Sequence, residues 1–167
     1  VCIMALTASA QVARPKLVVG LVIDQMRWDY LYRYQKRYTN GGFKRLLGEG
    51  FSCENTMIPY VPSVTAIGHT STYTGATPAI HGIAGNSFQI DGKDVYCCKD
   101  TTVESVGSKN DAGRMSPCNL LSTTIGDQIR LATDFNSKVI GVALKDRAAI
   151  LPAGRSANAA YWYDTKA

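Results

Sequence analysis

The sequence predicts an α/β fold in which helices flank a mostly parallel central sheet. Two continuous apolar runs rich in β-branched residues, 17–24 and 138–145, are typical of strands buried on both faces, and such strands belong to parallel sheets. Helical spacing lies between these strands, and the connections are short. With 167 residues, 46% hydrophobic and 19% charged, the composition is ordinary for one globular domain with a real core.

The remaining elements follow from local patterns. Asp91-Gly92 between two short alternating runs predicts a hairpin over 87–97, and the polar, Gly-rich stretch 99–117 predicts a loop. A helix begins at Thr65 after a Pro-Ser turn and is closed by Gly75 and Pro78. The other expected elements are helices over 28–38, 42–47 and 122–133, a strand over 51–58, a short helix broken at Pro152 and a final strand over 161–163.

The N-terminus has the character of an export signal. The apolar run in residues 1–10 ends in Ala8-Ser9-Ala10, the small-residue pattern of a signal peptidase site before Gln11. A buried strand or a frayed terminus is the alternative. We expect residues 1–10 to be the remnant of a signal peptide and the protein to be periplasmic or secreted.

Charge and composition narrow the class of partner. The net charge of +5 and a pI near 9.0 suit an anionic partner, but no basic run of five or more occurs. No nucleic-acid motif is present, and the aromatic-rich stretch 28–38 has the spacing of an amphipathic helix rather than of a base-stacking platform. No later apolar run approaches the roughly 20 residues of a membrane helix. We expect no nucleic acid and no membrane as partner, and the oligomeric state stays open.

The cysteines permit disulfides without choosing among them. Cys2 would leave with the signal, so that Cys53, Cys97, Cys98 and Cys118 remain, an even number in an oxidising compartment. Three pairings can be drawn. No spacing among them resembles a zinc ribbon.

Thr65 is the first candidate for chemistry, because its hydroxyl lies where a turn becomes a helix. At this position it would face unpaired backbone N–H groups and the positive end of the helix dipole, which attract a phosphoryl group and favour an alkoxide. Such a position suits a nucleophile. The alternative is an ordinary helix cap.

Charged residues follow the two predicted buried strands. Asp24 ends the first and is well placed to bind a cation, or alternatively to cap the next helix. Lys145 and Arg147 bracket Asp146 at the end of the later strand, and in an extended geometry both cations would share one face and reach one phosphoryl group, with Asp146 pointing away. A solvated charge cluster is the alternative. The carboxyl ends of strands in open α/β sheets line the functional crevice, so these residues and Thr65 can converge there.

Three further polar residues lie in or after the Thr65 helix. Asn86 ends a Gly-rich segment and could donate to a phosphate oxygen, or serve as a turn residue. His69 and His81 could ligate a metal, but for both we favour the structural interpretation of a hydrogen-bonded group packed in or under a helix.

Three stretches together, LVIDQMRWDYL, VPSVTAIGHTSTYTGATPAIHGIAGN and GVALKDRAAILPAGRSANAAYWYD, resemble the alkaline phosphatase superfamily, and in particular its secreted PafA-like monoesterases. The second stretch is also similar to the related type I phosphodiesterases and nucleotide pyrophosphatases. The Lys-Asp-Arg triplet is the feature that discriminates the monoesterases. The resemblance implies an alkaline-phosphatase-like catalytic domain of which residues 11–167 form the N-terminal part.

The resemblance also implies roles for single residues. Asp24 would be a zinc ligand, Thr65 a nucleophile that also meets zinc, and Asn86, Lys145 and Arg147 contacts to phosphate oxygens. It implies two zinc ions, a phospho-threonine intermediate and small phosphate monoesters as substrates. Two histidines are too few for two zinc sites, so we expect the other ligands beyond Ala167 and the isolated fragment to bind zinc poorly and to be inactive.

Two other functions stay open. One is a phosphodiesterase or nucleotide pyrophosphatase that shares Thr65 and Asp24. The other is a non-catalytic phosphate- or partner-binding module that keeps the fold without the chemistry. A sulfatase is less favoured, because the Cys/Ser-x-Pro-x-Arg context of its formylglycine is absent around Thr65.

Overall fold

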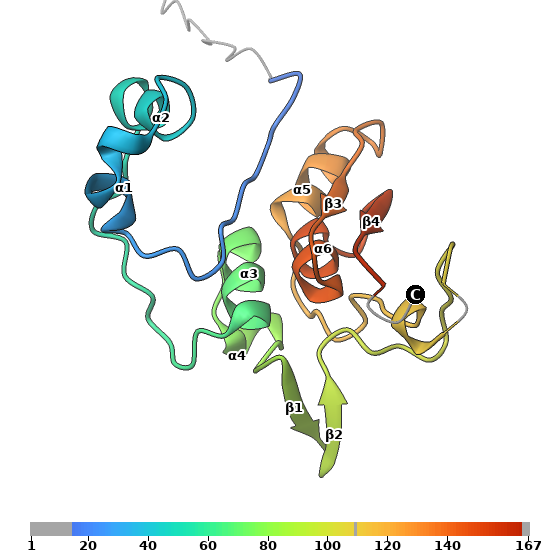
Figure 1. The fold of residues 1–167 in the computed structure, drawn as a ribbon. Coiled ribbons are helices and arrows are strands. Elements are labelled where there is room, and N and C mark those ends of the chain that lie inside the picture. The colour runs from blue at the N-terminus through green and yellow to red at the C-terminus, as the bar shows by residue number, and fades with distance from the viewer. Residues whose placement is uncertain (1–14, 109, 165–167) are drawn as a thin grey trace, which may run out of the picture.

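The computed structural model describes residues 15–108 and 110–164, so the expected signal peptide remnant over residues 1–10 lies outside the described residues. The first part of the described chain is helical, a pair of short strands follows, and only the last part alternates helices with short strands, as Figure 1 shows. The helices are α1 (Tyr30–Arg33), α2 (Phe43–Glu49), α3 (Thr65–Thr74), α4 (Pro78–His81), α5 (Ile125–Ala132) and α6 (Asp146–Ala153), with 3-10 turns η1 (Gln35–Arg37) and η2 (Asp111–Gly113). The strands are β1 (Ser87–Ile90), β2 (Lys93–Tyr96), β3 (Ile140–Val142) and β4 (Ala159–Tyr161).

The parallel part of the fold is the unit β3–α6–β4. Its strands pair in parallel, with Gly141 opposite Ala160, and α6 packs against both strands. Gly141 permits this packing because a Cβ there would overlap the carbonyl oxygen of Ala149 in α6. The α/β prediction is confirmed, although among the described residues the parallel sheet is limited to this one pair.

The predicted hairpin is confirmed as the antiparallel pair β1–β2. Asp91 and Gly92 both have positive φ, 51° and 75°, which is the geometry of a two-residue turn that matches the twist of the strands. Ser87 at one end pairs with Tyr96 at the other. The base of the hairpin therefore lies at the core, where Cys97 and Cys98 are fully buried.

The core lies between α3 and α6. Its buried members include Ala66, Ile83, Leu120 and Leu151, and Tyr96 and Trp162 pack against it from the edge. The two helices pack directly on each other, so that their N-termini are set by one shared core.

Two predicted strands are wrong. Residues 17–23 form no strand, Asp24 lies in a turn, and none of them has a strand partner among the described residues. Leu17 and Val19 are 78% and 75% exposed. Residues 51–58 form no strand either. An apolar run specifies a strand only if other strands pair with it, and the described chain supplies none. The first segment instead passes beside α3 (Figure 1), where Gly20 approaches the ring of Tyr73.

Smaller corrections concern the ends of elements. The predicted helix over 28–38 is divided at Tyr34 into α1 and η1, and the final strand ends at Tyr161 rather than Tyr163. Pro152 does not break α6, because it lies in the last turn, where its missing N–H forfeits only the bond to Ala148. The strand predicted over 138–145 is only three residues long.

Candidate functional site

Thr65 is the first residue of α3 but does not cap it. Val64 holds the N-cap position, and its own side chain makes no capping hydrogen bond. The Thr65 hydroxyl instead donates to Oδ2 of Asp24 at 2.9 Å. The ordinary cap that the sequence left open is therefore excluded, and a residue from the extended segment before α1 is brought to the hydroxyl.

Asn86 lies at the same end of α3. Its Oδ1 accepts the backbone N–H of Ala66 at 3.0 Å. Because an N–H can only donate, this contact fixes the amide so that the oxygen faces the helix and the NH2 group faces away. Asn86 thus satisfies one free N–H of the helix and keeps two donors for another acceptor.

Lys145 and Arg147 line a cavity of about 440 Å³ together with Asp146, Tyr96, Leu144 and Trp162. The extended geometry expected for this triplet is wrong: Lys145 is extended and is the N-cap of α6, whereas Asp146 and Arg147 are helical. Asp146 does not point away, since its Oδ1 accepts the Tyr96 hydroxyl at 2.8 Å. β3 ends at Val142 and α6 begins at Asp146, so the triplet lies at the turn from strand to helix.

The structure brings the five residues together in two groups. Thr65, Asp24 and Asn86 form the first, and Lys145 and Arg147 form the second. No hydrogen bond between described residues joins the groups directly. They are connected through the hairpin, because the carbonyl of Asn86 accepts the N–H of Cys97 at 3.0 Å, next to Tyr96.

The histidines are placed as the sequence indicated. His81 is fully buried, and its Nδ1 accepts the N–H of Ile83 at 3.1 Å, so Nε2 carries the proton and donates to Ser71 Oγ at 2.9 Å. Burial lowers the pKa of His81 and keeps it neutral. His69 is also buried, inside α3.

The described residues do not complete a metal centre. They contain no group of three or more His, Cys, Asp or Glu side chains that could hold an ion. Asp24 and Thr65 offer two neighbouring oxygen atoms, whereas a zinc ion takes four ligands. Asp24 and Thr65 alone therefore do not supply the ligands that a zinc ion takes.

The four cysteines in the described part of the chain are free. Cys53 and Cys118 are exposed, while the sulfurs of Cys97 and Cys98 are buried and 4.0 Å apart. Contact with the Cys97 thiol and burial raise the pKa of Cys98, which keeps that thiol protonated. None of the three pairings is present.

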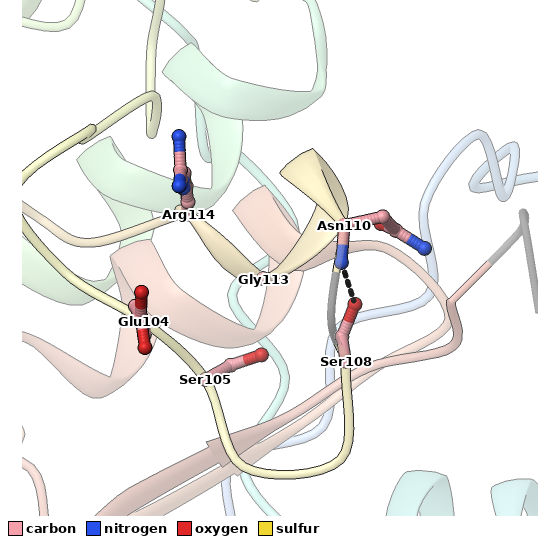
Figure 2. Close-up of a pocket in the computed structure, with 6 residues that line it drawn as sticks. All are labelled: Glu104, Ser105, Ser108, Asn110, Gly113 and Arg114. Atoms are coloured by element: carbon pink, nitrogen blue, oxygen red, sulfur yellow. Dashed lines mark hydrogen bonds between the residues drawn. The ribbon is translucent and has the colours of Figure 1, made fainter.

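A second cavity, of about 250 Å³, is polar and separate from the predicted residues. Figure 2 shows its lining by Glu104, Ser105, Ser108, Asn110, Gly113 and Arg114, with Ser108 bonded to the backbone of Asn110. Ser108 and Asn110 also donate to Asp164, which ties the loop to the chain after β4. We infer that the residues lining this cavity stabilise the fold of the loop and are not part of the candidate site.

Two residues that the sequence did not single out make several hydrogen bonds in the structure. Tyr96 contacts both Asp146 and Arg147, and nothing in the sequence marked it beyond its place at the end of the hairpin. Asp127 accepts hydrogen bonds at the start of α5 and carried a readable signal, since Thr124 and Asp127 have the spacing of a capping box. Among residues 15–108 and 110–164, no helix combines the length and the apolar composition of a membrane-spanning segment.

The comparisons with known proteins point to one family. The family model for type I phosphodiesterase / nucleotide pyrophosphatase matches residues 18–167. The chain is 65% identical over 156 residues to alkaline phosphatase PhoV of Synechococcus elongatus, covering 92% of the chain and 28% of PhoV. It is 62% identical over 164 residues to a protein of Myroides odoratus named calcium-transporting ATPase, covering 97% of the chain and 30% of that protein.

Solved structures of alkaline phosphatase PafA have the same fold. The wild-type structure superimposes with a TM-score of 0.90 at 60% identity, covering 93% of this chain and 30% of PafA. A PafA variant in which a threonine is replaced by serine, and an asparagine, a lysine and an arginine by alanine, also gives 0.90, at 57% identity over 93% of this chain and 31% of that one. The chain thus spans about 30% of the length of these relatives. It belongs to the type I phosphodiesterase / nucleotide pyrophosphatase family, within which it resembles alkaline phosphatases of the PafA kind.

Proposed function

We propose that this chain carries the nucleophile and the phosphate-binding residues of a phosphate monoester hydrolase, an alkaline phosphatase that acts through a phospho-threonine. The observation that supports this most directly is the Thr65 hydroxyl, which is held by Asp24 at the start of α3 instead of capping the helix. The four residue types substituted in the PafA variant are those of Thr65, Asn86, Lys145 and Arg147, in the same order.

The proposed reaction has two displacements at phosphorus. Thr65 Oγ attacks the phosphorus in line with the ester oxygen, the bond to that oxygen breaks, and the alcohol leaves with the proton of Thr65. Water then attacks the phospho-threonine, releases inorganic phosphate and restores the hydroxyl. Asp24 orients the Thr65 hydroxyl through the bond at 2.9 Å, and the NH2 group of Asn86 donates to an oxygen of the phosphoryl group.

We further propose that the reaction depends on two zinc ions. Asp24 and Thr65 would contribute one ligand each, and the other ligands would come from outside the described residues. Zinc, when bound, lowers the pKa of an attacking hydroxyl and stabilises a leaving oxygen. The protein would act on small phosphate monoesters in the periplasm or outside the cell.

Lys145 and Arg147 support a monoester rather than a diester as substrate. A monoester carries one more negative charge than a diester, and the two cations line one cavity at the start of α6. Preorganised cations of this kind stabilise the equatorial oxygens of a loose transition state. The second candidate, a phosphodiesterase, is favoured by the description of the family model, which names that activity.

The test compares p-nitrophenyl phosphate with its bis ester in the complete gene product. For Lys145→Ala and Arg147→Ala we expect kcat/KM for the monoester to fall about 100-fold, the usual cost of removing one donor to a developing oxyanion, with a much smaller loss for the diester. Lys138→Ala is the matched control, because Lys138 is exposed. Equal losses on both esters would favour the diesterase.

Thr65→Ala separates an enzyme from a binding module. We expect it to abolish turnover, and Thr65→Ser to retain a covalent phospho-enzyme detectable after acid quenching with labelled substrate. Full activity of Thr65→Ala would refute the nucleophile. ATP hydrolysis that requires calcium would favour the activity named for the Myroides odoratus relative.

A further inference from the structure

Three side chains form a hydrogen-bonded chain between the end of β2 and the start of α6. The Tyr96 hydroxyl donates to Asp146 Oδ1 at 2.8 Å and accepts from Arg147 Nη1 at 3.0 Å. Asp146 and Arg147 are neighbours on a helix, and their charged groups are 4.0 Å apart. The phenol therefore bridges two groups that do not form a close ion pair with each other.

The hydrogen bond to Tyr96 is important for the Arg147 guanidinium because that group is largely buried. The side chains of Arg147 and Asp146 are only 15% and 14% exposed, and Arg147 Nε is buried without a partner. A charged group removed from water requires hydrogen bonds to offset the loss of solvent. The hydroxyl of Tyr96 is the one hydrogen-bond acceptor that the described residues offer to Arg147. Without it the guanidinium would be free to swing toward water.

Asp146 fixes the direction of the Tyr96 hydroxyl. Since the phenolic hydrogen is donated to the carboxylate, a lone pair of the oxygen faces Arg147. Burial is the largest cause that raises the pKa of Tyr96 above its ordinary value, so the phenol keeps this hydrogen at alkaline pH. Burial lowers the pKa of Arg147, but the contact with Tyr96 and the charge of Asp146 outweigh it and raise the pKa.

The same hairpin sets the other predicted phosphate contact. Ser87 and Tyr96 are partners in the β1–β2 register, and Asn86 immediately precedes Ser87. Asn86 in turn bonds to the first turn of α3. The base of the hairpin thus holds Asn86 with one strand and Arg147 with the other, which gives both donors a common rigid support.

We propose that Tyr96 is a positioning residue for Arg147, holding its guanidinium in the cavity so that its other N–H groups face the substrate phosphate. This rests on the proposed function. In this proposal Tyr96 acts through Arg147 and not by a contact of its own with the phosphate. Its ring packs against the core and is retained in a phenylalanine, so Tyr96→Phe removes the hydroxyl alone.

The test measures Tyr96→Phe in the complete gene product with both esters. We expect kcat/KM for the monoester to fall about tenfold, because the guanidinium loses the acceptor that holds it in place, while the diester rate changes less than about twofold. The inhibition constant of inorganic phosphate should rise by a similar factor. Tyr161→Phe is the control, since Tyr161 is exposed on β4, outside the cavity.

A double-mutant cycle separates positioning from a merely structural role. In an Arg147→Ala background, Tyr96→Phe should have no further effect on the monoester, because the group that it positions is gone. Additive losses, equal losses on both esters, or an unchanged monoester rate in Tyr96→Phe would overturn the inference. If Arg147→Ala alone left monoester hydrolysis intact, the proposed function would fail instead, whatever Tyr96→Phe does.

Discussion

Replacement of Asp127 by asparagine should destabilise the protein strongly, although the shape of the side chain is kept. Asp127 is 3% exposed, and its two oxygens accept the backbone N–H groups of Ser156 at 2.7 Å and Thr124 at 2.9 Å. Ser156 Oγ donates as well, at 2.6 Å. This carboxylate therefore ties the start of α5 to the segment that follows α6.

The size of the loss in stability follows from the hydrogen bonds that the two carboxylate oxygens of Asp127 accept. In either orientation an asparagine turns its NH2 group toward backbone donors, so at least one buried N–H loses its acceptor, at about 1–3 kcal/mol. The remaining bonds lose their charge assistance, about 1–2 kcal/mol more. We expect a loss of about 2–5 kcal/mol out of a stability of about 5–15 kcal/mol.

Urea unfolding measures this loss, with Asp134→Asn as the control. Asp134 is exposed with positive φ, which asparagine also tolerates, so its replacement should change stability by less than about 0.5 kcal/mol. A loss for Asp127→Asn as small as that of the control would refute the hydrogen-bond argument.

The pH dependence gives a second check. Burial raises the pKa of Asp127, but the hydrogen bonds from Ser156, Thr124 and Arg155 outweigh it and lower the pKa in the folded state. The stabilisation is therefore complete above the unfolded pKa of about 3.9 and is lost as pH falls through the folded pKa. The difference in the free energy of unfolding between wild type and Asp127→Asn should become smaller in acid and be constant near neutral pH.

Two further predictions test the packing. Gly141→Ala should cost about 1–3 kcal/mol, because its Cβ would overlap the Ala149 carbonyl, whereas Gly48→Ala in α2 meets no atom and should be neutral or stabilising in thermal unfolding. In native protein, maleimide should label the exposed Cys53 and Cys118, whereas the buried pair Cys97 and Cys98 should react only after unfolding. Mass spectrometry counts the adducts. Labelling of the buried pair in native protein would contradict their burial.

Local signals explain what the sequence could predict. The helix at Thr65 has its turn before it and Gly75 after it, and Gly75 has a φ of 66°, which ends the helix as expected. The hairpin follows from Asp91-Gly92 alone. In both cases the residues that decide the conformation lie within the element itself.

Contacts between distant residues could not be predicted in the same way. The bond between Tyr96 and Arg147 joins residues 51 positions apart, and the bond between Thr65 and Asp24 joins residues 41 apart. The sequence indicated that Asp24 and Thr65 share a site, but not that the hydroxyl donates to the carboxylate. It missed Tyr96 because a tyrosine at the end of a strand has no distinctive pattern.

Residues 17–23 have the composition of a buried strand but do not form one in the observed structure. Their side chains are those of a buried strand, but in the described chain Leu17, Val19 and Leu21 are 75–78% exposed. Exposed apolar side chains in an extended segment without partners cost free energy that strand pairing and burial would recover. The pattern therefore predicts a strand, but the described residues supply no second strand to pair with it.

We predict that hydrogen exchange will show this directly. In the 167-residue chain the amides of residues 17–23 should exchange within seconds, because no described strand accepts them. In a chain extended to the length of its relatives the same amides should be protected by strands that pair with them. The amides of α3 are the internal control and should be protected in both chains, since they are bonded within the helix. Rapid exchange of residues 17–23 in both chains would show that the apolar run serves some purpose other than a strand.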